Sequence, residues 1–207
     1  MSAATATTAV VLSYLLGAVP TGLWLGLALR GIDIRRHGSK NIGATNTLRV
    51  LGKRLGVAAL VCDVGKGAIP VLLIARLSDW PYAPAACGLA AIIGHLAPVY
   101  VGFRGGKGVA TSAGVFLALC PPLFVAALTA FIAGVTVTRM VSVGSIAAAL
   151  TMAVAALVVP SGWATYPTHL VSDGRALRVL VVALGALVIL RHRANIRRML
   201  RGEESRM

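Results

Sequence analysis

The sequence has little charge and few aromatic side chains. Of its 207 residues, 13% are charged, about half the share that is usual in soluble proteins, and 5% are aromatic. Apolar residues make up 57%, more than a soluble chain of this length can bury. This composition excludes a soluble domain and a disordered chain.

Acidic residues are especially scarce. Six Asp and Glu stand against 20 Lys and Arg, which gives a formal net charge of +14. In a soluble protein this excess would indicate nucleic-acid binding. Here the basic residues lie between apolar runs, which is typical of the cytoplasmic side of a membrane protein. We therefore expect membrane lipid and anionic substrates as partners, and no nucleic acid.

Cysteine is rare as well. The three cysteines, Cys62, Cys87 and Cys120, lie in apolar runs, and no pair has the spacing of metal ligands. This excludes a disulfide scaffold, and we expect all three to be small buried apolar side chains. No basic residue precedes the first apolar run, so we expect no cleaved signal peptide.

Long apolar runs fill most of the chain. They are rich in Ala, Leu, Val and Gly and lack the alternation of a β-barrel, which predicts an all-α polytopic membrane protein. The runs cover residues 6–29, 55–76, 84–101, 109–138, 140–160 and 176–190. Because Pro121 and Pro122 interrupt the fourth run, we divide it and expect about seven transmembrane helices. No repeat or linker is visible, so residues 1–207 are expected to form a single domain.

Basic residues also predict the orientation in the membrane. Seven Lys or Arg lie in the loop between the first two runs, and six Arg follow residue 190. Seven crossings place both segments in the cytoplasm, with the N-terminus and the loops 77–83 and 161–175 outside. Residues 109–120 are shorter than the ~20 residues that a span usually needs, so the boundaries in that region stay open.

Three segments on the predicted cytoplasmic face, residues 38–49, 94–111 and 191–204, combine glycine, amides, hydroxyls and basic groups. Singly, they could be a capped solvated loop, a basic turn and a lipid-binding tail. Together they suit an anion, because glycine lets backbone N–H groups approach a ligand and Arg and Lys bind phosphate. Residues 104–108 differ from a nucleotide-binding P-loop, since Gly108 replaces the Ser or Thr.

Two ionisable residues, Asp63 and Lys66, lie one helical turn apart inside the second run. Charged groups at this depth are costly unless they are paired. We therefore expect an internal ion pair that supports the site rather than a pair that reacts with substrate.

The three segments resemble the signature motifs of the bacterial acyl-phosphate:glycerol-3-phosphate acyltransferases. The first motif corresponds to residues 39–46 with Arg49, the second to Gly94, His95, Pro98 and residues 103–111, and the third to Arg191, His192, Asn195, Ile196, Arg198, Gly202 and Glu204. Asp63, Lys66 and Gly67 fit a further family pattern. Three residues depart from it, since Lys40 replaces a glycine, Arg104 a lysine and Met199 a leucine. Lys40 could strain the loop, or it could add a useful cation.

The resemblance implies transfer of a fatty acyl group from acyl phosphate to the sn-1 hydroxyl of glycerol 3-phosphate. The products are lysophosphatidic acid and phosphate, in the first committed step of phospholipid synthesis. It implies a multi-pass protein of the bacterial cytoplasmic (inner) membrane with its active site on the cytoplasmic face. It also implies no metal or other cofactor, and an upstream enzyme that produces acyl phosphate. We expect a monomer, although sequence does not give the oligomeric state or the preferred acyl chain.

The resemblance also assigns residues to roles. Ser39, Arg49, Lys107 and His192 are the expected catalytic residues, with Ser39 and His192 orienting the glycerol substrate or moving its proton. The expected substrate-binding residues are Asn41, Gly43, Thr45, Asn46, His95, Arg104, Gly105, Gly106, Gly108, Thr111 and Asn195. Ser142 is added to them not from the resemblance but because residues 138–145 bring an arginine and two serine hydroxyls to the same predicted face. Asp63, Lys66 and Glu204 are expected to support the site. The general base is either a histidine or a phosphate oxygen of the substrate.

Two other functions are compatible with the composition. One is a small-anion or lipid transporter of the inner membrane, and the other is a structural membrane subunit. A transporter needs polar groups through the midplane, and a structural subunit needs no glycine-rich basic loops. Because the polar residues crowd one predicted face, we favour surface chemistry on an amphiphile.

Overall fold

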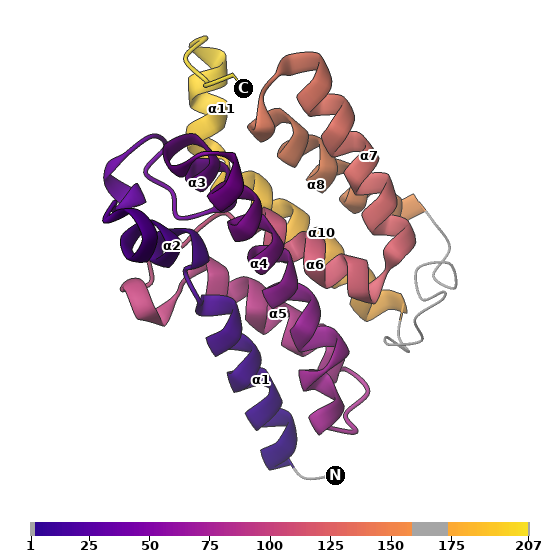
Figure 1. Ribbon diagram of the computed structural model, residues 1–207. Helices are drawn as coiled ribbons and strands as arrows, with labels where there is room; N and C mark the ends of the chain where they lie inside the picture. Colours follow the sequence, from indigo (N-terminus) through magenta and orange to yellow (C-terminus); the bar gives the residue numbers. More distant parts are fainter. Residues whose placement is uncertain (1–2, 159–173, 207) are drawn as a thin grey trace. The chain divides into compact units, whose positions relative to one another are not determined.

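Figure 1 shows the computed structural model, which describes residues 3–158 and 174–206. Regular secondary structure in these ranges is entirely helical, as the apolar runs predict. Most of the predicted outer loop 161–175 lies outside the described residues. The chain divides into two compact units, residues 1–118 and 119–207, and each is described in turn.

From residue 3 onward, where the structure describes it, the first unit contains nine helical elements. They are α1 (Ala3–Ala18), α2 (Thr21–Arg30), η1 (Ile34–Arg36), α3 (Ala44–Leu51), α4 (Lys53–Leu72), η2 (Ile74–Leu77), α5 (Ala83–Leu96), η3 (Val99–Val101) and α6 (Val109–Leu119), whose last residue lies just past the unit boundary. The run expected at residues 6–29 is divided at Val19 and Pro20, and α1 and α2 meet there at 45°. Pro20 causes this break because it lacks an N–H group and cannot continue a helix.

Glycine sets how closely the helices of the first unit pack. A Cβ on Gly17 of α1 would lie 2.5 Å from the Cα of Ala91 in α5, and α1 and α5 lie side by side (Figure 1). A Cβ on Gly67 of α4 would lie 3.0 Å from the carbonyl carbon of Thr111 in α6. Real Cβ atoms do not approach backbone this closely, so only glycine permits these contacts.

A small apolar cluster joins the first two polar segments. Leu23 of α2, Ile34 of η1 and Ile42 are buried together, and Val101 of η3 packs against them. The rings of Trp24 and Tyr100 also meet, with centroids 5.7 Å apart. The segments 38–49 and 94–111 therefore lie at the same end of the first unit.

The second unit contains α7 (Pro121–Thr138), α8 (Val141–Val158), α10 (Gly174–Arg191) and α11 (Arg193–Leu200). The short connection from α7 to α8 turns at Arg139, whose φ is +60°, and the helices pack where Gly134 faces Gly144. α10 packs against α8. A bend of 52° separates α10 from α11, and His192 lies at that bend.

The predicted break at the proline pair is confirmed, since α6 ends at Leu119 and α7 begins at Pro121. In the described residues, four helices are long and apolar enough to cross a membrane, and each of the two bent pairs could supply one more span. The eleven-residue α6 is too short by the same measure. The prediction of seven spans requires α6 to be one of them, so the count of seven stays a prediction.

Cysteine burial differs from the prediction at one position. Cys87 and Cys120 are buried as expected, but Cys62 is exposed. It lies next to the buried Asp63 on α4, so the following residue of the same helix faces inward while Cys62 faces outward. The expectation that all three are buried is therefore wrong for Cys62.

Candidate functional site

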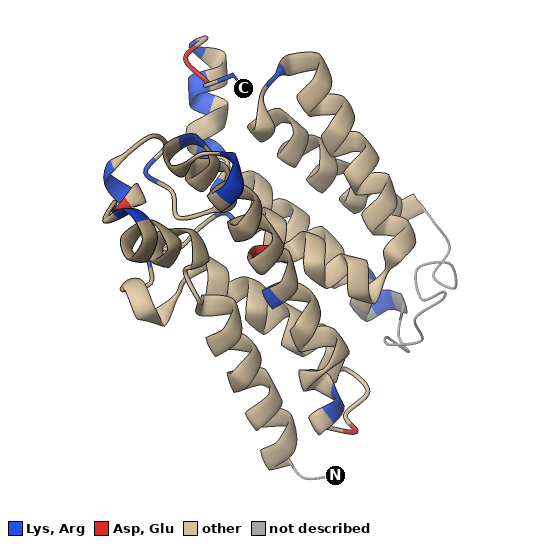
Figure 2. Ribbon diagram, viewed as in Figure 1, with Lys and Arg blue, Asp and Glu red and all other residues tan. Residues whose placement is uncertain are grey.

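Basic residues gather at one end of the first unit. Figure 2 shows their positions along the ribbon of α3 and the loop that precedes it, whereas α1 contains no basic residue. Arg35, Arg36, Lys40 and Arg49 are exposed there, and Asp33 is the one acidic residue between Gly31 and Gly52. This end of the unit therefore carries a positive field that attracts anions.

The first polar segment forms a tight loop around Ser39. Gly38 and Lys40, on either side of Ser39, both have left-handed backbones, with φ of +56° and +59°. Glycine adopts this conformation freely, but for lysine it costs about 1–2 kcal/mol. The loop therefore holds Lys40 in a strained conformation, and the exposed Lys40 adds a cation beside Ser39.

The two amides of this segment bind its own backbone. Asn41 Oδ1 accepts the Gly43 N–H at 2.9 Å, where Gly43 precedes the first turn of α3. Asn46 is buried, and its amide binds four backbone groups. Thr45 is half-buried, and Arg49 is exposed on α3. The substrate contacts expected of these residues stay a prediction.

In the second polar segment, the loop that contains Gly105 and Gly106 packs against His95. The Gly106 N–H donates to the carbonyl oxygen of His95 at 3.0 Å. The imidazole lies against Gly106, where a Cβ would come within 2.9 Å of the ring carbon Cε1. A Cβ on Gly105 would lie 2.5 Å from the carbonyl carbon of Leu96. The buried His95 therefore supports the loop that carries Arg104 and Lys107.

The loop leads into the N-terminus of α6, where two buried hydroxyls stand out. Gly108 has a φ of +83°, and α6 begins at Val109. Thr111 Oγ1 and Ser112 Oγ have no hydrogen-bond partner among the described residues. Helix N-termini favour anions because their first N–H groups have no intrahelical acceptor. Two hydroxyls and Lys107 at such an end suit phosphate oxygens.

Ser112 was not among the residues predicted from the sequence. It lies one position beyond the second motif, and a serine in an apolar helix ordinarily bonds to its own backbone. A hydroxyl in the first turn after a glycine-rich basic loop is the signal that could have found it.

The ion pair expected inside α4 is present. Lys66 Nζ lies 2.8 Å from Asp63 Oδ1, with side chains 5% and 2% exposed. Lys66 also donates to the carbonyl of Val19 at 2.7 Å, at the corner between α1 and α2. His95 Nδ1 lies 4.0 Å from Asp63 Oδ1. The pair thus links the α1–α2 corner to the histidine beneath the glycine loop.

In the second unit, the Glu204 carboxylate accepts hydrogen bonds from three side chains. Its Oε1 accepts from Ser142 Oγ at 2.8 Å and from Asn195 Nδ2 at 2.6 Å, and its Oε2 accepts from Arg198 Nε at 2.7 Å. Burial raises the pKa of Glu204, but these donors together outweigh it and hold the pKa below its usual value. Glu204 therefore ties the start of α8 to α11. The substrate contacts expected of Ser142 and Asn195 stay a prediction.

This network predicts a loss of stability in acid. A lowered folded pKa means that ionised Glu204 stabilises the fold above its unfolded pKa, near 4.5. That stability disappears as the pH falls through the lower folded value. We expect Glu204→Gln to lower stability at pH 7 by about 1–3 kcal/mol and to flatten the decline of the melting temperature below pH 4.5. The measurement is thermal unfolding in detergent from pH 7 to 3. The exposed neighbour variant Glu203→Gln should match the wild type, and identical curves for both variants would contradict the assignment.

His192 is buried at the bend between α10 and α11. Its Nδ1 lies 2.7 Å from the carbonyl oxygen of Val188. Because a carbonyl only accepts, Nδ1 carries the proton in this contact, and Nε2 is the ring nitrogen that can accept one. This tautomer suits a general base.

Within the first unit, packing of Val101 against the buried cluster that contains Ile42 brings the segments 38–49 and 94–111 to the same end. The convergence of Ser39, Arg49 and Lys107 on one substrate stays a prediction. His192, Ser142, Asn195 and Glu204 belong to the second unit, and their convergence with the other residues stays a prediction. Among the described residues, no three His, Cys, Asp or Glu side chains form a group that could hold a metal ion.

Comparisons with known proteins agree over nearly the whole chain. A family model described as glycerol-3-phosphate acyltransferase matches residues 7–202. The glycerol-3-phosphate acyltransferase of Fusobacterium nucleatum is 42% identical over 197 residues, with 95% of each chain covered. That of Geobacter sulfurreducens is 43% identical over 195 residues, which cover 94% of this chain and 93% of the relative.

Two solved structures are similar as well. The crystal structure of PlsY (YgiH), an integral membrane glycerol 3-phosphate acyltransferase, matches in its glycerol 3-phosphate form with a TM-score of 0.83 and 37% identity. This match covers 98% of this chain and 95% of the other. Its lysophosphatidic acid form matches with a TM-score of 0.80, 36% identity and the same coverage. Together with the apolar helices, these similarities identify a multi-pass membrane protein.

Proposed function

Because the chain belongs to the glycerol-3-phosphate acyltransferase family, we propose that it transfers a fatty acyl group from acyl phosphate to the sn-1 hydroxyl of glycerol 3-phosphate. The products are lysophosphatidic acid and inorganic phosphate. The observation that carries this proposal is the anion site at the N-terminus of α6, where Lys107 and the glycine loop precede two buried hydroxyls without hydrogen-bond partners in the described chain.

Both substrates carry phosphate, so the site needs cations and backbone donors more than acids. We assign phosphate binding to Arg49, Lys107 and Asn195. The loop of Gly105, Gly106, Lys107 and Gly108 holds the acyl phosphate. The Gly106 N–H is already bonded to His95, so the loop binds phosphate through its other groups and through the first turn of α6.

Acyl phosphate is a mixed anhydride with a good leaving group. The sn-1 oxygen of glycerol 3-phosphate attacks the acyl carbon, the bond from that carbon to the phosphate oxygen breaks, and phosphate leaves with its electron pair. Positioning and electrostatic stabilisation carry most of the rate acceleration in such a step. No acyl-serine intermediate is required.

The proton of the sn-1 hydroxyl passes to a base. The Nδ1–H bond of His192 to Val188 leaves Nε2 as the ring nitrogen that can accept a proton, which supports His192 in this role, with Ser39 orienting the hydroxyl. A phosphate oxygen of the substrate is the alternative base. The acyl chain lies among the helices in the bilayer, and its phosphate lies at the cytoplasmic surface of the bacterial inner membrane. An upstream enzyme that makes acyl phosphate supplies the donor.

The test is phosphate release by the purified protein in detergent with EDTA. Palmitoyl phosphate is supplied with and without glycerol 3-phosphate, and palmitoyl-CoA serves as a parallel donor. We expect phosphate release only with both substrates, with lysophosphatidic acid formed in step. Turnover with the thioester alone would overturn the donor assignment. No turnover with either donor, in protein with a cooperative thermal transition, would overturn the enzyme assignment and favour a transporter.

A further inference from the structure

Resting on this proposed function, we infer that Asn46 is a positioning residue that fixes Ser39 through the backbone of its loop, rather than a residue that contacts substrate. Asn46 lies on α3, seven residues after Ser39. Its side chain is 1% exposed, whereas Ser39 is exposed.

Four hydrogen bonds occupy the Asn46 amide. Nδ2 lies 2.9, 3.2 and 2.8 Å from the carbonyl oxygens of Ile34, His37 and Asn41, and since it has two hydrogens, one of them is shared between two of these acceptors. Oδ1 accepts the Ser39 N–H at 2.8 Å. If the amide were flipped, Oδ1 would face three carbonyl oxygens, none of which can donate a hydrogen bond. The three carbonyls therefore determine the orientation of the Asn46 amide. No hydrogen of this amide is left over for a substrate.

The loop is shaped around this amide. A Cβ on Gly38 would clash with Asn46 Oδ1, and Gly38 also has a left-handed backbone with φ of +56°. Position 38, directly before Ser39, therefore accepts only glycine without strain. The N–H of Ser39 points at Asn46. The amide acts as a fixed centre around which residues 34–41 turn.

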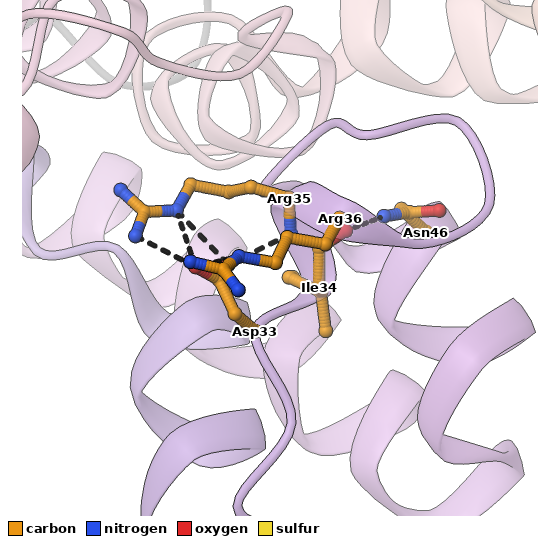
Figure 3. Close-up of polar contacts among 5 residues, drawn as sticks. All are labelled: Asp33, Ile34, Arg35, Arg36 and Asn46. Carbon is orange, nitrogen blue, oxygen red and sulfur yellow. Dashed lines mark hydrogen bonds and ion pairs between the residues drawn. The ribbon is translucent and has the colours of Figure 1, made fainter.

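An ion pair stabilises the η1 turn, whose Ile34 carbonyl accepts a hydrogen bond from Asn46. Asp33 caps the η1 turn by accepting the Arg35 N–H at 3.0 Å, and Arg35 Nη2 lies 2.8 Å from Asp33 Oδ2. The hydrogen bond from the Arg35 side chain lowers the pKa of Asp33 to about 2. Figure 3 shows this pair beside the bond from Asn46 to Ile34. The Ile34 side chain is buried against Leu23 and Ile42, so the carbonyl that Asn46 binds is itself held in place.

A positioning residue and a substrate ligand give different kinetics. Removing a positioning group lowers kcat, because a reacting group that moves by about 1 Å can lose ~100-fold in rate. Removing a substrate ligand raises the KM of that substrate. We expect Asn46→Ala and Asn46→Asp each to lower kcat by about 10- to 100-fold and to leave both KM values within about threefold. Asn46→Asp keeps the shape of the side chain and the acceptor for Ser39, but it turns a carboxylate oxygen toward the three carbonyls.

Amide hydrogen exchange provides a readout independent of activity. The Ser39 N–H is protected by its bond to Asn46 Oδ1, so Asn46→Ala, which removes this acceptor, should exchange the amide at least ~10-fold faster. Arg36→Gln is the matched control, because Arg36 belongs to the same turn but is 83% exposed and lies 3.9 Å from Asp33. It should leave the Ser39 exchange rate at the wild-type value. A thermal transition near that of the wild type establishes that each variant is folded.

Two results would overturn the inference. One is full kcat in both variants. The other is unchanged Ser39 exchange in Asn46→Ala with a raised KM for one substrate, which would make Asn46 a substrate ligand. An inactive wild type would instead overturn the proposed function, and exchange would still decide whether Asn46 holds Ser39.

Discussion

Replacement of Lys66 by methionine should be among the most destabilising single substitutions in the first unit. It leaves the Asp63 carboxylate buried inside α4 without the ammonium 2.8 Å away. Removing one partner of a buried ion pair typically costs about 3–5 kcal/mol, because the remaining charge is left desolvated. Asp63→Asn should behave similarly, since the Lys66 ammonium keeps its hydrogen bond to the Val19 carbonyl but loses the carboxylate that neutralises it. Thermal and denaturant unfolding in detergent measure both losses.

The double variant distinguishes the cost of an unpaired buried charge from the loss of the hydrogen bond between Lys66 and Val19. Asp63→Asn combined with Lys66→Met removes both charges at once, so most of the stability lost in each single variant should return. A remaining loss of about 1 kcal/mol is expected, because Val19 no longer receives the Lys66 hydrogen bond. A double variant no more stable than the singles would contradict this account.

The second large effect is expected at Gly67 of α4. A Cβ there would lie 3.0 Å from the carbonyl carbon of Thr111 and 3.1 Å from the backbone nitrogen of Val115 in α6. Backbone cannot rotate away as a side chain can, so Gly67→Ala must push the two helices apart. Overpacking of this kind costs about 1–3 kcal/mol. Because Thr111 lies in the first turn of α6, the displacement also reaches the glycine loop, and on the proposed function phosphate release should fall.

Gly65 supplies the matched control two residues earlier on the same helix. A Cβ at Gly65 would meet nothing within 4 Å, so Gly65→Ala should be neutral or stabilising by up to about 1 kcal/mol, the difference in helix propensity. The melting temperature and the rate of phosphate release of the two variants are compared directly. Equal effects at both positions would show that close packing of α4 on α6 is not the cause.

Features that depend on neighbouring residues could be predicted from the sequence. The break before Pro121 and the ion pair between Asp63 and Lys66 follow from local chemistry, because a proline stops a helix and residues one turn apart share a face. Pro20 carries the same signal inside the first apolar run, yet that run was expected to be unbroken. Apolar composition indicated a helix there, but it did not indicate where the helix bends.

Features that depend on distant contacts could not be predicted. The sequence marks Asn46 and Ser142 as polar residues in suitable places, but not what they bind. Ser142 meets Glu204 across 62 residues of chain. Asn46 meets four backbone groups, and backbone carries no sequence signal. Motifs therefore located the candidate site, while tertiary structure distinguishes side chains held by the protein from hydroxyls such as Thr111 Oγ1 that have no partner in the described chain.

The spacing of Asp63 and Lys66 has a consequence for how the protein enters the bilayer during synthesis. Each charge alone at the centre of an inserting helix costs about 2.5–3.5 kcal/mol. Because the two residues are i and i+3 on one helix, they can meet as soon as α4 is helical, before any other helix is present. Asp63 and Lys66 therefore neutralise each other within α4, and the helix inserts with no net buried charge. Biogenesis of this helix need not wait for a partner helix to neutralise it.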